Sequence, residues 1–499
     1  MDLNNPDFKV FQKNYNNGKD QLLFLSFAAD VHTPVSALIK LKNEKYTFLF
    51  ESVEKGSQKG RYSVIGIKPD LIWECKNNIC KFKNLNLSSK KKIMDTTPLE
   101  SLKILLNNNK INLPKNIPSI STGLFGYMGY EMIQYFENIK LNKDNNLNLP
   151  DSIFIRPSIT LVFDNVNDKL FVTKLVSKNH LNSSDSLKLA KKDILTIINK
   201  INKPISKKSF STFHIKKNFN IFKNVKSNTS FNEFKIMVNK AKKYIYEGEV
   251  FQVVLSRIFK KKIETDSLSI YRALRYLNPS PYLFFMNFKN FSIVGSSPEI
   301  LIKLENQKVT IRPIAGTRKR GKTKSEDENL KNELLNDPKE IAEHLMLLDL
   351  GRNDLSRVTK PGTVSVTDKM YVEFFSHVMH IVSNIEGTKN KNKKQTDVLF
   401  SGFPAGTVTG APKIRAIQII DELEKNRRNV YAGSVGYIAA DGNIDTCIAL
   451  RTAVIKDKHI YIQSGAGIVA DSDPLNEFKE TENKALALLT ACEQARIFK

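Results

Sequence analysis

Cysteine and tryptophan are scarce in this sequence, which has four cysteines and one tryptophan among 499 residues. Four cysteines this scattered are too few for a disulfide framework. Only Cys75 and Cys80 lie close together, without a C-x-x-C spacing or a matching histidine pattern. We therefore expect neither structural disulfides nor structural zinc.

Long apolar runs are also missing. No uninterrupted apolar segment approaches the roughly 20 residues that a membrane-spanning helix needs. The first residues, MDLNNPDFKV, do not combine a basic stretch with an apolar run, which is the pattern of a secretory signal. We expect a cytosolic protein with no membrane segment.

Acidic residues are outnumbered, with 51 Asp and Glu against 77 Lys and Arg and a formal net charge of +26. Clustered basic residues can bind nucleic acid. Here the excess is mostly lysine, spread along the chain and mixed with asparagine, as in residues 76–92 and 389–395. These runs lack aromatic stacking partners, and no recognisable nucleic-acid module accompanies them. We expect no nucleic-acid partner.

What is present indicates a large globular protein. The length allows two or three domains or one large layered core, and 41% of the residues are hydrophobic. Residues 1–200 contain short β-like runs separated by polar turns, and residues 201–229 have no sustained periodicity. We divide the chain into an N-terminal region (1–200), a connection (201–229) and a C-terminal region (230–499).

The C-terminal region begins with a helix and contains an antiparallel meander. Ser230 and Glu233 form a capping box before an apolar stripe, and Gly248 suits the helix end. Residues 250–259 alternate as a strand that carries the polar Gln252. Residues 433–440, 443–455 and 459–467 form three strands joined by tight turns. Strands joined in this way are antiparallel, so the pattern predicts an α+β fold.

Two acidic pairs have the spacing i, i+3: Glu340 with Glu343, and Glu477 with Glu480. On a helix such carboxylates share one face and repel each other, unless a cation lies between them. A hard divalent cation is a candidate, because it takes oxygen ligands. The alternative is an ordinary solvated helix face, since Asp421 and Glu424 have the same spacing.

A series of ordered motifs resembles the chorismate-utilising enzymes, in particular the large subunit (component I) of anthranilate synthase. The matching segments are FQVVLSR (251–257), NPSPY (278–282), GSSPE (295–299), RPIAGTR (312–318), EHLMLLDLGRNDLSR (343–357), HVMH (377–380), GFPAGTVTGAPK (402–413), YAGSVGY (431–437), DTCIALRT (445–452), QSGAGIVADSDP (463–474) and E-x-x-E-T-x-N-K (477–484). Two further segments, 49–66 and 123–131, match the family's N-terminal region. The resemblance implies a four-layer αββα sandwich of two large antiparallel sheets with helices outside.

The resemblance also implies a magnesium and chorismate site. Glu343 and Glu480 would ligate Mg²⁺, with Glu340 and Glu477 nearby through water. The matching substrate-binding positions are Gly316, Thr317, Tyr431, Arg451, Gly465, Ala466 and Gly467. Arginine suits a bidentate contact with a carboxylate of chorismate. Lys484 either touches the substrate or only pairs with Glu480.

Three activities in this family differ in what attacks C2 of chorismate. Relatives that add water have a lysine base where this chain has Gln252, and many aminodeoxychorismate synthases have a nucleophilic lysine where it has Ala315. Ammonia carries its own lone pair and needs neither lysine. The resemblance therefore favours anthranilate formation, the first committed step of tryptophan biosynthesis. Glu299 would be the general acid, and His380 and Thr407 would assist the pyruvate elimination.

Control and partners follow from the same resemblance. The residues that match the family's tryptophan site are Glu51, Ser52, Asn278, Pro279, Ser280, Pro281, Tyr282 and Leu283. No cysteine has the context of a glutaminase nucleophile, so we expect a separate glutamine amidotransferase subunit (component II) in a heterotetramer. Two alternatives stay open: an aminodeoxychorismate synthase, and a basic binding protein that keeps the fold without catalysis.

Overall fold

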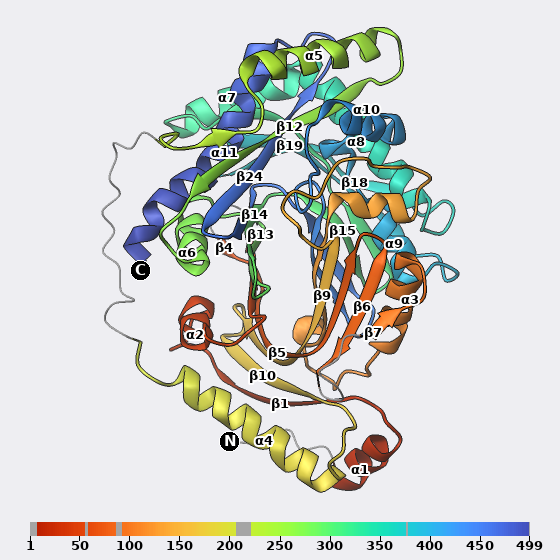
Figure 1. The fold of residues 1–499 in the computed structure, drawn as a ribbon, viewed down its shortest axis with the longest axis vertical. Helices are drawn as coiled ribbons and strands as arrows, with labels where there is room; N and C mark the ends of the chain where they lie inside the picture. The colour runs from red at the N-terminus through yellow and green to blue at the C-terminus, as the bar shows by residue number, and fades with distance from the viewer. Residues whose placement is uncertain (1–6, 55–57, 86–91, 206–220, 376–377, 499) are drawn as a thin grey trace.

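The structure is a computed structural model that describes residues 7–54, 58–85, 92–205, 221–375 and 378–498 (Figure 1). His377 of the HVMH motif and most of the predicted 201–229 connection lie outside the described residues. Among the described helices, none has both the length and the apolar composition needed to cross a bilayer.

Antiparallel strands make up most of the described chain, and all but the β3–β4 pair belong to one hydrogen-bonded network. The strands are β1 (Gln21–Ala28), β2 (Phe48–Glu51), β3 (Val53–Glu54), β4 (Gln58–Lys59), β5 (Tyr62–Lys76), β6 (Ile79–Asn84), β7 (Lys92–Met94), β8 (Gly123–Met128), β9 (Ser152–Asp164), β10 (Lys169–Val176), β11 (Lys226–Ser227), β12 (Gln252–Lys262), β13 (Tyr282–Asn287), β14 (Ser292–Ser297), β15 (Ile300–Glu305), β16 (Lys308–Ile311), β17 (Ile314–Lys319), β18 (Ser365–Phe374), β19 (Val378–Thr388), β20 (Gly410–Ala411), β21 (Ser434–Ala439), β22 (Ile444–Ile448), β23 (Thr452–Lys456) and β24 (His459–Ile468).

The α-helices lie along the outside of these strands in Figure 1, with α4 at the lower edge and α5 at the top. They are α1 (Phe8–Asn16), α2 (Pro34–Leu41), α3 (Pro98–Asn108), α4 (Ser183–Ile201), α5 (Phe231–Tyr246), α6 (Ser267–Leu277), α7 (Lys324–Asn336), α8 (Pro338–Ser356), α9 (Gln395–Ser401), α10 (Lys413–Leu423) and α11 (Pro474–Gln494). A short 3₁₀ helix, η4 (Gly406–Val408), carries Thr407.

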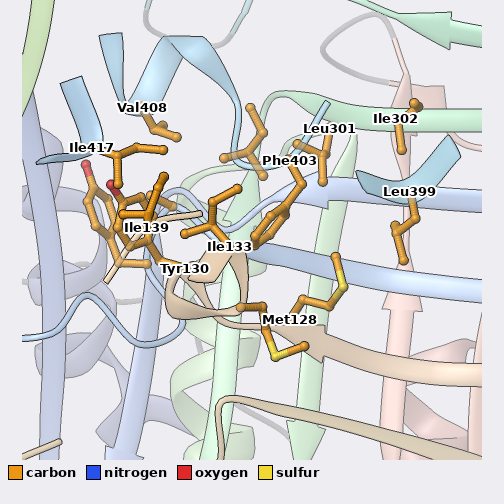
Figure 2. Packing of buried hydrophobic residues seen from close by; sticks show 14 of the residues in the cluster. Met128, Tyr130, Ile133, Ile139, Leu301, Ile302, Leu399, Phe403, Val408 and Ile417 are labelled. Atoms are coloured by element: carbon orange, nitrogen blue, oxygen red, sulfur yellow. The ribbon is translucent and has the colours of Figure 1, made fainter. Parts of the chain in front are cut away.

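Three apolar layers separate these elements. The middle layer consists almost wholly of strand residues, such as Phe48, Phe125 and Phe284. A second layer joins strands to α1, α2, α4, α6 and α11. The third joins strands to α3, α5, α8, α9 and α10, and Figure 2 shows part of it, including Leu399 and Ile417. Helices, strands, strands and helices therefore follow one another, which confirms the predicted four-layer α+β sandwich.

Long bent strands connect the two sheets of the sandwich. In β5, Ile65 and Ile67 belong to the layer that contains α4, whereas Leu71 and Trp73 belong to the layer that contains α3. The β5–β9 pairing is irregular between Pro69 and Leu71. Such an irregularity bends a strand and lets it pass from one sheet to the other. This passage explains why two packed sheets form one continuous hydrogen-bonded network.

Several sequence predictions are confirmed locally, and one is wrong. The capping box of Ser230 and Glu233 precedes α5, and Asp473 caps α11. The segment 443–455, predicted as one strand, is divided into β22 and β23 near Arg451, which has a φ of 46°. Strand β22 pairs with β15 and β21, whereas β23 pairs with β14 and β24. The break therefore sends the chain to a new set of partners.

The first 200 residues share their sheets with the later part of the chain. Strand β2 pairs with β13, and β8 pairs with β21. A side chain at an N-terminal position can therefore lie beside one that follows it by more than two hundred residues. The boundaries at 200 and 230 stay a prediction.

Candidate active site

Helices α8 and α11 place the two acidic pairs close enough for their charges to interact. Glu340 and Glu343 lie on α8, and Glu477 and Glu480 lie on α11. Burial raises the pKa of Glu343, and the negative charges of Glu340 and Glu480 raise it further. Burial and the charge of Glu480 likewise raise the pKa of Glu477. The predicted metal ligands therefore repel one another across two helices that are distant in sequence.

A divalent cation would relieve this repulsion. The donor set fits Mg²⁺, which commonly binds one or two carboxylates and completes its shell with water and substrate oxygens. Within the part of the chain that the structure describes, no three acidic, histidine or cysteine side chains converge as a complete metal centre. Two carboxylates alone would leave the other positions of such an ion to water and substrate oxygens.

Glu340 has a partner that the sequence did not indicate. Arg318 donates to Glu340 at 2.9 Å and also pairs with Glu333 and Asp337. Glu480, a predicted ligand, is ion-paired as well, with Lys484 at 2.6 Å, so ion pairing does not separate the inner from the outer carboxylates. The outer role of Glu340 stays a prediction.

Gln252 lies at the start of β12 and is 5% exposed. Its Nε2 donates to Glu343 at 3.2 Å. Its Oε1 is buried and has no hydrogen-bond partner among the described residues. A buried acceptor without a partner is costly, so it marks a place where a ligand can donate. One end of the Gln252 amide therefore binds the acidic cluster, and the Oε1 at its other end can accept a hydrogen bond from a ligand.

His380 on β19 faces an irregularity in β17. The register shifts between Ala315 and Thr317, and Gly316 has a φ of 67°. His380 Nδ1 lies 2.9 Å from the Gly316 carbonyl oxygen and 3.1 Å from Thr317 Oγ1. A carbonyl only accepts, so we assign the imidazole proton to Nδ1. Burial lowers the pKa of His380 to about 4, which leaves Nε2 free to accept a proton at neutral pH.

Glu299 follows β14 and is 6% exposed. Burial raises the pKa of Glu299 to about 8, although the Thr407 hydroxyl and the charges of Arg451 and Lys484 act in the opposite direction. At neutral pH the carboxyl group is therefore mostly protonated and can donate a proton. Thr407, also predicted as a catalytic residue, has a buried Oγ1 with no hydrogen-bond partner among the described residues.

Arg451 occupies the break between β22 and β23, in a left-handed conformation that non-glycine residues rarely adopt. Among the described residues, none accepts a hydrogen bond from its guanidinium group. Burial lowers the pKa of Arg451, and Glu299 opposes this effect. A half-buried guanidinium without a partner is suited to hold a ligand carboxylate.

Strand β24 supplies the remaining predicted substrate positions. Ala466 is fully buried, and a Cβ at Gly465 would lie 2.8 Å from the Tyr431 hydroxyl oxygen. A Cβ at Gly467 would lie 2.7 Å from Gln252 Nε2. Both glycines therefore let functional side chains approach the strand closely.

Lys484 forms the ion pair with Glu480 that the sequence left open, and its contact with substrate stays a prediction. Its Nζ lies 2.6 Å from Glu480 and donates to the Gly465 carbonyl at 3.0 Å. It is therefore an ion-pair partner of a predicted metal ligand and also reaches the strand that holds the predicted substrate positions.

The predicted regulatory residues also come together, although they lie far apart in sequence. Glu51 pairs directly with Leu283 in the β2–β13 ladder. Its carboxylate is 7% exposed and accepts from Tyr271 at 2.6 Å and from Arg275 at 2.8 Å. The other members described here are half-buried Ser52, Asn278, Pro279 and Pro281, buried Ser280, and Tyr282, whose hydroxyl donates to Asp445 at 2.8 Å. The sequence missed Tyr271 and Arg275, whose signal is an i, i+4 spacing on α6.

Glu424 and Arg428 form a further buried pair next to Tyr431, and the sequence interpretation missed it. An i, i+4 acidic and basic pair was the available signal, but such pairs are usually on the surface.

Comparisons with known proteins place this geometry in a family. The family model for chorismate binding enzymes matches residues 47–490, and the chain belongs to that family. It is 44% identical to anthranilate synthase component 1 of Cereibacter sphaeroides, over 98% of both chains, and 42% identical to that of Acetivibrio thermocellus, also over 98% of both. A crystal structure of anthranilate synthase component I from Streptococcus pneumoniae matches with a TM-score of 0.75 and 33% identity, covering 93% of this chain and 99% of that one. The resemblance stated from the motifs is confirmed.

Proposed function

We propose that this chain is the chorismate-converting subunit of an anthranilate synthase, a lyase that acts at the first committed step of tryptophan biosynthesis. It would join ammonia to chorismate and release anthranilate, pyruvate and water. The observation that carries the proposal is full-length similarity to anthranilate synthase component 1 proteins, combined with Gln252 and Ala315 where water-adding and aminodeoxychorismate-forming relatives have lysines.

The first half of the reaction replaces the C4 hydroxyl by an amino group at C2. The nitrogen lone pair of ammonia forms the new bond at C2, both ring double bonds shift by one position, and the C4–O bond breaks. The new ammonium group then releases one proton and becomes the amino group. Glu299, protonated because of its raised pKa, donates the proton with which the hydroxyl leaves as water. The free Oε1 of Gln252 accepts an N–H of the incoming ammonia and orients its lone pair.

The second half eliminates pyruvate. A base takes the C2–H proton, the C–H electrons form the C2–C3 double bond that makes the ring aromatic, and the bond between C3 and the enolpyruvyl oxygen breaks. The released enolpyruvate takes up a proton on its methylene carbon and becomes pyruvate. His380 presents an unprotonated Nε2, because its Nδ1 donates to the Gly316 carbonyl. Arg451 holds a carboxylate of the substrate. These roles use each side chain in the protonation state that its surroundings favour.

Magnesium would be held by Glu343 and Glu480, with Glu340 and Glu477 close by. When bound, the ion would neutralise a substrate carboxylate and stabilise negative charge that develops on oxygen. The mutual repulsion of these carboxylates supports the assignment.

Ammonia would come from a separate glutamine amidotransferase subunit, in a heterotetramer with this chain. A protected route is needed because most free ammonia is protonated at neutral pH and then has no lone pair. L-tryptophan would inhibit the enzyme at the cluster around Glu51 and Leu283. The cytosolic location expected from the sequence stays a prediction.

The test is an assay of the purified chain with chorismate, Mg²⁺ and either ammonium salt or glutamine. Anthranilate fluorescence should appear with ammonium, should be absent with glutamine alone, and should be lost when a chelator removes Mg²⁺. Turnover with glutamine alone would contradict the need for a partner, and full turnover with chelator would contradict the metal assignment.

A further inference from the structure

One buried ion pair, Glu424 with Arg428, lies next to the candidate active site, and none of the proposed reaction steps uses it. Glu424 follows α10, and Arg428 lies four residues later. The two residues are 4% and 3% exposed. Arg428 donates from Nε to one carboxylate oxygen of Glu424 at 3.0 Å and from Nη2 to the other at 2.6 Å. This bidentate arrangement fixes the plane of the guanidinium group.

The same guanidinium group touches two other segments of the site. Its Nη1 donates to the carbonyl of Val408 at 2.7 Å, and its Nη2 donates to the carbonyl of Val254 at 2.6 Å. Val408 directly follows Thr407 in η4, and Val254 lies two residues after Gln252 in β12. A single side chain therefore links the backbone beside two predicted catalytic residues.

Tyr431 is the third group that lies beside Arg428. It follows Arg428 by three residues, and its ring centroid lies 5.5 Å from the Arg428 guanidinium carbon. The Tyr130 ring lies 4.8 Å from the same carbon. The cation thus lies beside two aromatic rings, one of which belongs to a predicted substrate-binding residue.

Glu424 extends the contact to the neighbouring strand. Its Oε1 accepts from the Ser256 amide and from the Ser256 hydroxyl, each at 2.8 Å. Gln463 donates to that hydroxyl at 2.8 Å, two residues before Gly465 in β24. The pair therefore contacts β12, η4 and the Tyr431 segment directly, and β24 through Ser256.

We propose that Arg428 and Glu424 are positioning residues that hold Gln252, Thr407 and Tyr431 in their relative places. The inference rests on the proposed function. Four of the five N–H bonds of Arg428 are committed to groups on three different segments, and the group is rigid and planar. A lysine has no second nitrogen and cannot make these contacts together. If the pair served stability alone, its disruption would lower the melting temperature without changing the turnover of molecules that remain folded.

The test compares Arg428→Lys with a matched control, Arg156→Lys. Arg156 is 5% exposed and pairs with Asp70 at 2.7 Å and with Asp20 at 2.8 Å, but it touches none of the predicted site residues. Both variants keep the charge and lose a planar, buried contact. Folded protein is confirmed by circular dichroism well below each melting temperature. Then kcat with ammonia, its dependence on Mg²⁺ and pH, and the chorismate Kd by calorimetry are measured.

We expect kcat of Arg428→Lys to fall about tenfold to a hundredfold and chorismate binding to weaken, because small misplacements have effects of that size. The Mg²⁺ requirement and the pH midpoints should stay unchanged, since Arg428 contacts neither Glu343 nor His380. Arg156→Lys should keep its kcat within twofold. A folded Arg428→Lys with wild-type kcat and Kd, or equal losses in both variants, would overturn the proposal. Inactive wild-type protein that still binds chorismate would refute the proposed function instead, and the Kd comparison would then decide about positioning.

If Arg428→Lys does not fold, the Ser256→Ala variant tests the positioning role in its place. It removes one hydroxyl group that joins Glu424 to Gln463 and leaves both charges in place. A kcat lowered threefold or more at unchanged Mg²⁺ requirement would support positioning, and a smaller change would overturn it.

Discussion

Replacing Glu299 by glutamine should make the protein more stable at alkaline pH and nearly inactive at every pH. The carboxyl group is 6% exposed, and burial raises its pKa to about 8 from the ordinary value of 4.5. A buried carboxylate without a full set of donors is costly to ionise. Glutamine has nearly the same shape but never carries that charge, so the substitution isolates the cost of ionisation.

The size and sign of the effect follow from proton linkage. Below pH 4.5 both the folded and the unfolded states hold the proton, and the contribution of Glu299 to the free energy of unfolding is at its maximum. As the pH rises through the window from 4.5 to 8, the unfolded chain releases its proton first and that contribution is lost. At 1.36 kcal/mol per pH unit, the complete loss is about 5 kcal/mol.

The assay is urea unfolding of the wild type and Glu299→Gln between about pH 5 and 8.5. Other titrating groups are common to both proteins and cancel in the difference between their free energies of unfolding. That difference should change by several kcal/mol in favour of the variant as the pH rises. Glu328→Gln, at a carboxylate with 57% side-chain exposure, is the control for the same substitution made on the surface. Turnover of Glu299→Gln should fall by about 10²–10⁴-fold, because an amide cannot transfer a proton to the leaving hydroxyl.

A difference that stays constant between pH 5 and 8.5 would refute the reasoning, because Glu299 would then be ionised in the folded protein throughout. Retained turnover in the glutamine variant would show that another group is the acid. The wild-type enzyme should also lose activity as the pH rises through about 8, when the concentration of unprotonated ammonia is held constant. If the residual activity of the variant still falls as the pH rises through about 8, a group other than Glu299 causes that fall.

Three further outcomes are expected. Glu480→Gln should abolish turnover without lowering the melting temperature, and near-normal activity at limiting Mg²⁺ would contradict its role as a ligand. Gly467→Ala should lower kcat with ammonia roughly tenfold, because the new Cβ would lie 2.7 Å from Gln252 Nε2 and displace it. An unchanged kcat would mean that the reaction does not need the Gln252 amide in its present position. L-tryptophan should inhibit the wild type, and Ser52→Phe should relieve inhibition with little loss of activity; wild-type activity unchanged at millimolar tryptophan would show that feedback control is absent.

Local signals were sufficient for the elements that carry the site. Capping residues and apolar periodicity predicted α5 and the start of α11, since these depend on neighbours within one or two turns. The alternation in residues 250–259 predicted β12 for the same reason. Ordered motifs then supplied the family and, through it, the four-layer fold.

Tertiary features could not be predicted in this way. The break at Arg451 falls within a continuous run of strand-forming residues, and a positive φ at arginine has no local signal. The passage of β5 between two sheets depends on partners that are distant in sequence. Glu424 and Arg428 have the spacing of a surface pair, and only burial beneath Tyr431 distinguishes them from one. Sequence patterns indicate which face of a helix or strand is buried. The contacts between helices and strands determine whether a charged side chain is buried and which partner it has.

The most direct test of the central claim is the identity of the product formed from chorismate, Mg²⁺ and ammonium carrying a heavy nitrogen isotope. The account predicts labelled anthranilate and an equal amount of pyruvate from the isolated chain. Unlabelled isochorismate as the end product would show that water is the nucleophile. Labelled aminodeoxychorismate without pyruvate would show that amination takes another course and that the elimination step is missing.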